Sequence, residues 1–293
     1  MKSKFLMGAF WFILLGGIFF KIPSAKCEKG HKVLFYNQFS VRAMPLLGVD
    51  DEFGLNYSYY FSDSDSILFK NNNVGLGVFD CINPATNSLG VFVEVEPIAV
   101  FKLRVQYEYV QYFGAFTAML VFPDKNSDYS DSELEYLEEE KEAVWATGQV
   151  FTVMPTFQIM VGRFVALDMM KFRWYDMNKE GYFYEPTEDT LAEMEDYFFT
   201  NEAVIGVALW KKDEKNMLLL GTRHLYFSLE ESGKQRQELD GVLVWMRDKL
   251  FFMENPTVMT AIGGYLEDQY RTKDVMIGLV FSFEYSLNQN STF

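Results

Sequence analysis

The chain has 293 residues, of which 49% are hydrophobic and 17% aromatic, and its formal net charge is -15. The acidic excess argues against nucleic acid or an anionic lipid surface as the partner, because phosphate groups need a basic surface. A mean hydropathy of -0.05 excludes a bundle of several transmembrane helices. A membrane β-barrel can be neutral, because only alternate residues face lipid.

Residues 1–25 have the composition of a secretory signal peptide. Two lysines open the segment, an unbroken apolar run covers positions 5–20, and small residues at 23–25 suit cleavage. We therefore predict an exported chain whose mature part, residues 26–293, forms a single domain. The alternative is an uncleaved N-terminal membrane anchor, for which the apolar run is slightly short.

The mature chain contains two cysteines, Cys27 and Cys81, and neither lies in a Cys-x-x-Cys or zinc-ligand spacing. In an oxidising compartment the two could form a disulfide that ties the mature N-terminus to the third predicted strand. Two unpaired thiols are equally compatible with the sequence.

A period of two dominates the mature chain. Apolar side chains occupy the odd positions of 99–109, whereas Lys102, Arg104 and Glu108 lie on even positions. A helix would scatter these two sets around its circumference, so the segment is predicted to be a β-strand with one apolar face. The remaining candidate strands are 32–43, 53–61, 73–82, 88–96, 111–122, 144–160, 164–176, 203–209, 215–228, 239–247, 257–267 and 275–287.

These candidates number thirteen, and short polar or Gly/Pro turns join most neighbours into a meander of hairpins. Single-chain bacterial membrane barrels use even strand numbers. We therefore predict an all-β protein, an antiparallel up-and-down transmembrane β-barrel of about 12 strands. A barrel of about 14 strands is the alternative if 144–160 or 239–254 is divided differently.

Three longer polar connections, 123–142, 177–201 and 229–238, interrupt the meander, and the first two are strongly acidic. Long loops at one end and short turns at the other are typical of outer-membrane barrels. Within the acidic connections, the composition of Ser132–Lys141 and Thr187–Asp196 predicts two short helices. These loops are also candidates for contact with divalent cations, although a solvated acidic loop is the more common explanation.

Five charged residues on predicted strands are candidates for the barrel lumen. Lys102, Arg104 and Glu108 share one strand face, and Lys171 and Arg173 share another. A charge on the lipid side of a barrel costs about 2–4 kcal/mol at the membrane midplane, so these side chains should face inward. There they could pair across a narrow, plugged lumen or line a water-filled pore and set its selectivity.

The last predicted strand, 275–287, carries an apolar stripe on its odd positions. In this strand the chain resembles the Gram-negative outer-membrane β-barrel class, whose closing strand has a glycine followed by alternating apolar or aromatic residues. Those places are taken by Gly278, Phe281, Phe283 and Tyr285. Met276 departs from the pattern, which has a polar residue there. The resemblance implies an outer-membrane location, contact with the lipid bilayer and recognition of this strand by the assembly machinery.

Few side chains suit catalysis. The chain has two histidines, His31 and His224. His224 and Ser228 share a strand face but lie about 13 Å apart, too far for a hydrogen bond between them. The sequence has no phosphate-binding glycine loop, dinucleotide fingerprint or Gly-x-Ser-x-Gly motif. We therefore expect no enzymatic activity and no cofactor.

Three functions fit this architecture. The preferred prediction is a narrow, porin-like channel for small polar solutes. One alternative is a barrel that stabilises the envelope, or presents its acidic loops to a partner, without transport. The other is a soluble exported β-barrel that binds a lipidic ligand, since aromatic side chains also pack soluble cores.

Overall fold

The computed structural model of the protein describes residues 29–44, 47–61, 69, 72–115, 117–139, 143–213 and 215–287. The predicted signal peptide, residues 1–25, and Cys27 lie outside these residues. Among the described residues, no helix has the length and apolar character needed to cross a membrane.

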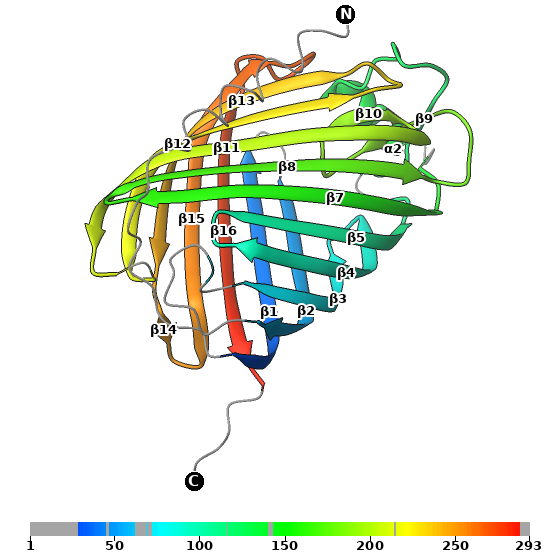
Figure 1. Cartoon of the computed structure of the whole chain (residues 1–293). Coiled ribbons are helices and arrows are strands. Elements are labelled where there is room, and N and C mark those ends of the chain that lie inside the picture. Colours follow the sequence, from blue (N-terminus) through cyan, green and yellow to red (C-terminus); the bar gives the residue numbers. More distant parts are fainter. Residues whose placement is uncertain are drawn as a thin grey trace, which may run out of the picture.

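Twelve long antiparallel strands close into a barrel (Figure 1). Each pairs with its neighbours in the chain, and the last returns to pair with the first, so the ring has no free edge. The strands are β1 (Gly30–Met44), β2 (Gly48–Tyr60), β3 (Asn73–Ile82), β4 (Thr86–Ile98), β5 (Phe101–Tyr112), β7 (Ala146–Val161), β8 (Phe164–Asp176), β11 (Glu195–Lys211), β12 (Met217–Leu229), β13 (Gln235–Met246), β15 (Met253–Glu267) and β16 (Val275–Ser286). The prediction of an all-β barrel with about 12 strands is confirmed.

One of the thirteen candidate strands, 111–122, does not form a barrel strand, so that prediction is wrong. β5 continues to Tyr112 and the chain then leaves the wall, where only β6 (Val121–Phe122) is extended. β6 joins β9 (Tyr182–Glu185) and β10 (Thr190–Glu193) in a separate small sheet. The apolar residues of the segment suggested a wall strand, but Ala118, Met119, Leu120 and Phe122 are buried among the loops instead.

Alternation along each strand separates an apolar outer wall from a mixed inner wall. On β5, Tyr107 is exposed on the outside, whereas Tyr112 is almost completely buried inside. Large apolar side chains stand exposed on strands far apart in the ring, including Leu76 at 60%, Leu89 at 62% and Ile205 at 65%. A lipid bilayer would cover such a surface, which soluble monomers rarely expose.

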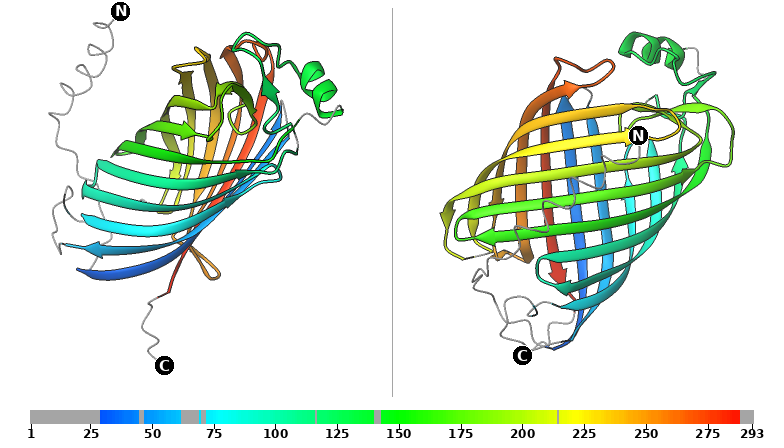
Figure 2. Two further views of the ribbon diagram at one scale, coloured as in Figure 1. Left: turned by 90° about the vertical axis from the view of Figure 1, so that its right-hand side faces the viewer. Right: turned by 45° about the horizontal axis from the view of Figure 1, so that its top comes forward.

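The two longest connections lie at one end of the barrel (Figure 2). The connections from β5 to β7 and from β8 to β11 both leave the wall at the end where β1 finishes. The first contains α2 (Asp131–Glu139), so the helix predicted at Ser132–Lys141 is present. Tight turns join β4 to β5 and β7 to β8 at the opposite end, which also carries β14 (Lys249–Leu250). We call these the loop end and the turn end.

The helix predicted at Thr187–Asp196 is wrong. This segment supplies the turn of the β9–β10 hairpin, then β10, then the first residues of β11. Phe183 and Leu191 of the hairpin are completely buried, so packing against the barrel overrides the helical composition. Asp189 follows the turn with a φ of 49°, a left-handed conformation that Asp tolerates better than most residues.

The possible disulfide between Cys27 and Cys81 stays a prediction, because Cys27 lies outside the described residues. Cys81 lies near the loop end of β3. The strand register places Gly30 level with Tyr60 and Asn73 at the turn end. About eight residues of strand, roughly 26 Å, separate Asn73 from Cys81, whereas three residues span at most roughly 10 Å.

Candidate functional site in the barrel lumen

The β9–β10 hairpin folds into the loop end of the barrel and constricts its lumen. Arg42 on β1 donates a hydrogen bond to the carbonyl of Pro186 at 3.3 Å. Arg173 on β8 and Arg236 on β13 form ion pairs with Glu188, the latter at 3.8 Å. β1, β8 and β13 are not neighbours in the wall, so the hairpin turn lies across the middle of the lumen.

Apolar packing seats the hairpin against the inner wall. Phe183 meets Tyr112 of β5 edge-on, with 5.8 Å between ring centroids. Beside them, Tyr175 of β8 stacks on Phe198 of β11 at 4.2 Å. These rings belong to one buried cluster that joins the hairpin to strands from β5 to β12. The hairpin is therefore held by apolar burial at its base and by charges at its turn.

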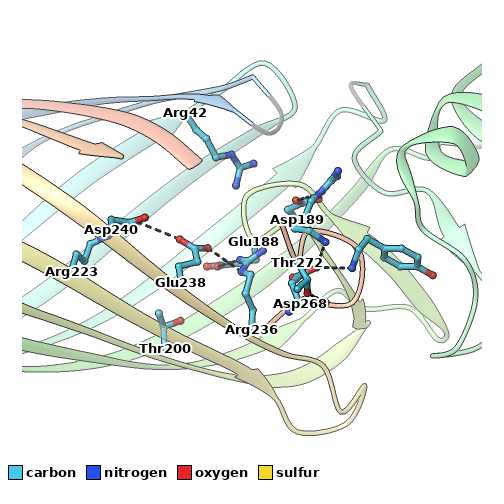
Figure 3. A network of polar contacts seen from close by, with 12 residues as sticks. Arg42, Glu188, Asp189, Thr200, Arg223, Arg236, Glu238, Asp240, Asp268 and Thr272 are labelled. Atoms are coloured by element: carbon cyan, nitrogen blue, oxygen red, sulfur yellow. Dashed lines mark hydrogen bonds and ion pairs between the residues drawn. The ribbon is translucent and has the colours of Figure 1, made fainter. Parts of the chain in front are cut away.

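A ladder of ion pairs continues from Glu188 along β13 and β12 (Figure 3). Arg236 Nε lies 3.1 Å from Glu238. Arg223 Nη2 lies 3.4 Å from Glu238 and 2.6 Å from Asp240. Arg236, Glu238 and Asp240 alternate along β13, so all three point to the same side of the strand. All five side chains are largely buried, and each charge has an opposite partner, as burial of a charge requires.

A second cluster fastens the hairpin to the outer loops. Arg271, in the turn between β15 and β16, forms an ion pair with Asp189 at 2.9 Å. It also donates to Asp131, the first residue of α2, at 2.7 Å. The hydroxyl of Tyr184 donates to Asp189 at 2.6 Å. One buried guanidinium thus joins three separate loops.

Glu185, at the end of β9 and outside the spanning strands, is a buried carboxyl beneath the hairpin turn. Tyr112 donates its hydroxyl to this group at 3.2 Å, and the backbone N–H of Glu188 donates at 2.6 Å. Burial and the negative charge of Glu188 raise the pKa of Glu185 to about 7. Burial opposes ionisation of Glu188 too, but Arg173 and Arg236 outweigh it and lower the pKa of Glu188.

We expect the hairpin to be held less firmly as the pH rises toward about 7. The pKa of Glu185 lies above its ordinary 4.5, so the folded state binds this proton more tightly than the unfolded chain. Its stabilisation is complete below pH 4.5 and is lost as pH rises through about 7, a change on the order of 3 kcal/mol. Urea unfolding of detergent-folded protein at several pH values measures it.

Glu185→Gln should flatten this pH dependence, because the amide cannot titrate. Glu135→Gln, at an exposed position on α2, is the matched control and should leave the dependence unchanged. An unfolding free energy that falls equally with pH in wild type and Glu185→Gln would contradict the assignment.

A polar chamber of about 380 Å³ lies inside the barrel toward the turn end. Lys102 forms an ion pair with Glu94 at 2.9 Å. Arg104 lies 3.6 Å from Glu52, and its guanidinium stands 3.9 Å from the ring centroid of Phe92. β5 and β2 are separated by two strands, so the contact between Arg104 and Glu52 runs across the inner faces of β3 and β4.

Glycines on β3 and β4 make room for the rings beneath Arg104. A Cβ at Gly77 would stand 2.4 Å from the Phe92 ring, and one at Gly90 would stand 2.4 Å from the Phe79 ring. Such approaches are too close for any side chain. The guanidinium of Arg104 lies over both rings, 5.4 Å from the centroid of Phe79.

The five charged residues predicted for the lumen take different places. Lys102 and Arg104 line the chamber, whereas Arg173 contacts the hairpin. Glu108 follows Arg104 on the same side of β5 and accepts a hydrogen bond from a neighbouring glutamine at 2.7 Å. Lys171 lies two positions before Arg173 on the same side of β8. Their pore-lining role stays a prediction.

Sequence reasoning missed the residues that hold the hairpin. Glu188 and Arg271 lie in connections, and Arg236 fell within a predicted loop, although it belongs to β13. The spacing of Arg236, Glu238 and Asp240 at every second position was the available signal. It indicates a charged inner face that begins before the predicted start of this strand, residue 239.

The residues predicted to direct assembly lie in the strand that closes the ring. β16 pairs with β15 on one side and with β1 on the other. The Phe283 ring lies 6.4 Å from that of Phe35 on β1 and 5.8 Å from that of Phe281. Tyr285 is exposed, and Gly278 pairs within both ladders. Recognition by the assembly machinery stays a prediction.

The acidic loops use their carboxylates internally. Asp124 and Asp128 accept hydrogen bonds from the backbone N–H groups of Asn126 and Ser130, at 2.8 and 2.9 Å. In the described part of the chain, no group of three or more His, Cys, Asp or Glu is placed to hold a metal ion. Contact of these loops with divalent cations stays a prediction.

Comparisons with known proteins identify no narrower family. No family model matches the sequence, and no curated protein matches it. The chain is similar to the β-domain of the Bordetella autotransporter Brka, with 9% identity, 88% of this chain and 100% of that chain covered, and a TM-score of 0.44. It is also similar to the KdgM porin (9% identity, 85% and 98% covered, TM-score 0.37) and to an outer-membrane channel from Pseudomonas putida F1 (10% identity, 92% and 98% covered, TM-score 0.39). The architecture that the resemblance implied, a closed antiparallel β-barrel, is present in the structure.

Proposed function

We propose that this protein is an outer-membrane channel for small polar solutes, closed at rest by the β9–β10 hairpin. The buried charge around the hairpin turn supports this most directly. It comprises Arg173, Arg223, Arg236, Glu188, Glu238 and Asp240. Burying an ion costs several kcal/mol, and apolar residues of similar volume often give equal or greater stability. A purely structural plug would not need these charges, whereas a path for polar solutes does.

The two walls of the barrel support a membrane location over a soluble lipid carrier. A soluble barrel that enclosed a lipidic ligand would place its apolar side chains inside and its charges outside. Here Arg104 and Glu52 face the interior, and Leu76, Leu89 and Ile205 are exposed on the outer wall. This arrangement matches a bilayer outside and water inside.

A structural or surface-presenting barrel is the second candidate, and one observation favours it. The loops form an apolar core of their own, which includes Leu120, Phe122, Tyr129, Leu134 and Leu191. A plug that is anchored by such a core resists opening. This candidate predicts a folded membrane protein that conducts no ions under any charge substitution.

Planar-bilayer recording of the reconstituted protein tests the proposal. Wild-type protein should be closed for most of the record, with brief openings. Glu188→Gln should lengthen the openings several-fold, because it removes the two ion pairs that join Glu188 to β8 and β13. Glu135→Gln on exposed α2 is the matched control and should behave as wild type.

Selectivity provides an independent measurement. If solutes pass through the chamber, replacing Lys102 and Arg104 with glutamate should shift the reversal potential toward cations. Heat-modifiable gel mobility establishes that each variant is folded. Absence of current from folded wild type, from Glu188→Gln and from the double variant would overturn the channel and leave the structural barrel.

A further inference from the structure

A pocket of about 320 Å³ opens among the loops at the loop end. Its walls come from the connection that carries α2, from β10 and from the turns β12–β13 and β15–β16. We call it the vestibule and define it by Tyr129, Thr190, Phe227, Lys234, Arg236 and Gln269. It lies apart from the polar chamber, with which it shares no lining residue.

Lys234 enters the vestibule without a direct ion pair, and Asp268 and Asp124 interact with its charge at longer range. Its ammonium lies 5.1 Å from the ring centroid of Tyr129 and donates a hydrogen bond to the side-chain carbonyl of Gln269 at 2.6 Å. Within the part of the chain that the structure describes, no carboxylate forms an ion pair with it. Burial lowers the pKa of Lys234, which is the expected cost of a partly desolvated cation.

Arg236 forms the floor between the vestibule and the lumen. It lines the vestibule and also an inner cavity that contains Glu188 and Glu238. Its Nε and Nη2 lie toward these two carboxylates, at 3.1 Å from Glu238 and 3.8 Å from Glu188. The residue is 4% exposed, and its Nε and Nη1 are buried without a hydrogen-bond partner. A guanidinium has five N–H donors, so Arg236 keeps donors that no acceptor of the protein satisfies.

The two acidic residues of the vestibule are held by hydrogen bonds within the protein. Asp268 accepts hydrogen bonds from the backbone N–H groups of Tyr270 and Arg271, both at 2.8 Å. Glu267 accepts one from the side chain of Gln237 at 2.8 Å. Both carboxylates keep their negative charge, and the cationic groups that line this pocket are Lys234 and Arg236.

We propose that the vestibule binds the carboxylate or phosphate group of a small organic solute. Lys234 and Arg236 contact the anion, since charge-assisted bonds from these groups are short and strong. The rings of Tyr129 and Phe227 pack against the carbon skeleton of the solute. Lipid phosphates share this chemistry, and we commit to the free solute because the pocket is compact.

A bound anion would also weaken the closed state, a consequence that rests on the proposed channel function. Arg236 contacts Glu188, whose ion pairs hold the hairpin turn in the lumen. An anion beside Arg236 would share its positive charge and so weaken the attraction between Arg236 and Glu188. The solute would therefore favour opening of the path that it enters.

Calorimetric titration of the full, folded protein in a nonionic detergent tests the binding site. Benzoate should bind and benzylamine, with the same ring and opposite charge, should not. Lys234→Gln should weaken benzoate binding at least about tenfold, the loss expected for one charge-assisted contact. Lys212→Gln, at an exposed position at the turn end, should bind as wild type. Heat-modifiable mobility shows that both variants are folded.

Four outcomes test the proposed site and separate it from the channel. Equal binding of benzoate and benzylamine, or unchanged benzoate binding in Lys234→Gln, overturns the site. Dependence on Lys234 that appears only in phosphatidylglycerol vesicles, and never with benzoate in detergent, assigns the site to lipid and overturns the free solute. Benzoate binding that requires Lys234 in a protein without conductance supports the site and removes the channel, so the two proposals fail separately.

Discussion

Removal of residues 281–293 is expected to abolish the folded barrel. Phe281 pairs with Phe39, and Phe283 with Asn37, in the ladder that joins β16 to β1. The truncation leaves the ends of β1 and β15 without a partner strand, and each unpaired backbone group in lipid costs several kcal/mol. We expect loss of the heat-modifiable band and of protein in the detergent-soluble membrane fraction.

Removal of residues 288–293 alone is the matched control, because the ladder between β16 and β1 ends at Ser286 and Leu34. The shorter truncation should fold normally. A further variant, Phe281→Ala with Phe283→Ala, keeps the backbone ladder and removes the rings. It should fold in detergent but assemble slowly in cells if the assembly machinery reads these rings. A membrane-inserted, heat-modifiable barrel from the long truncation would refute the closing role of β16.

Arg173→Ala is expected to destabilise the closed state by about 3–5 kcal/mol, the usual cost of removing one partner of a buried ion pair. Arg173 contacts Glu188 and donates to the hydroxyl of Thr200 at 3.2 Å. Its loss leaves Glu188 beside the buried carboxyl of Glu185, with Arg236 at 3.8 Å and Lys171 as its remaining counter-charges. Urea unfolding in detergent measures the stability, and bilayer recording should show a larger open fraction.

Two further variants distinguish the effect of the buried charge from the effect of side-chain packing. Arg163→Ala removes an exposed arginine from the turn between β7 and β8 and should change neither quantity. Arg173→Met with Glu188→Met replaces the pair by apolar side chains and should recover most of the stability, because neither charge is left buried alone. If Arg173→Ala matches wild type in unfolding and conductance, the ion pair does not hold the hairpin.

The barrel could be predicted because its signals are local. In 99–109 the apolar and polar residues alternate, which defines two strand faces without reference to the rest of the chain. Charges such as Lys102 and Arg104 are costly in lipid, so the strand face that carries them is expected to point into the barrel. Thirteen candidate strands were then reduced to a prediction of about twelve, because single-chain membrane barrels have even strand numbers. The extra candidate was 111–122, which has apolar residues that pack beneath the loops.

The hairpin in the lumen could not be predicted, because its structure depends on distant contacts. Thr187–Asp196 has a helical composition, but β10 pairs with β9, and β9 pairs with β6 about sixty residues earlier in the chain. Glu188 gives no local sign that it will contact Arg173 and Arg236. Loop conformation follows from tertiary packing more than from propensity.

The possible disulfide also depends on contacts between distant parts of the chain. Cys27 and Cys81 are the only two cysteines, so their pairing was reasonable from the sequence. Strand register bears on this pairing, because β1 begins at the turn end and Cys81 lies near the loop end. Pairing of residues across a barrel depends on shear and register, which are properties of the closed ring.

By itself, the sequence determined an apolar outer wall, a charged inner wall and a closed ring of about twelve strands, because side-chain period and the cost of charge in lipid act on each strand separately. Only the tertiary structure decided that the lumen is constricted, that Arg236 separates a vestibule from the interior, and that Glu185 has a raised pKa. Each of these depends on which side chains from distant strands and loops meet, and on how much water remains between them.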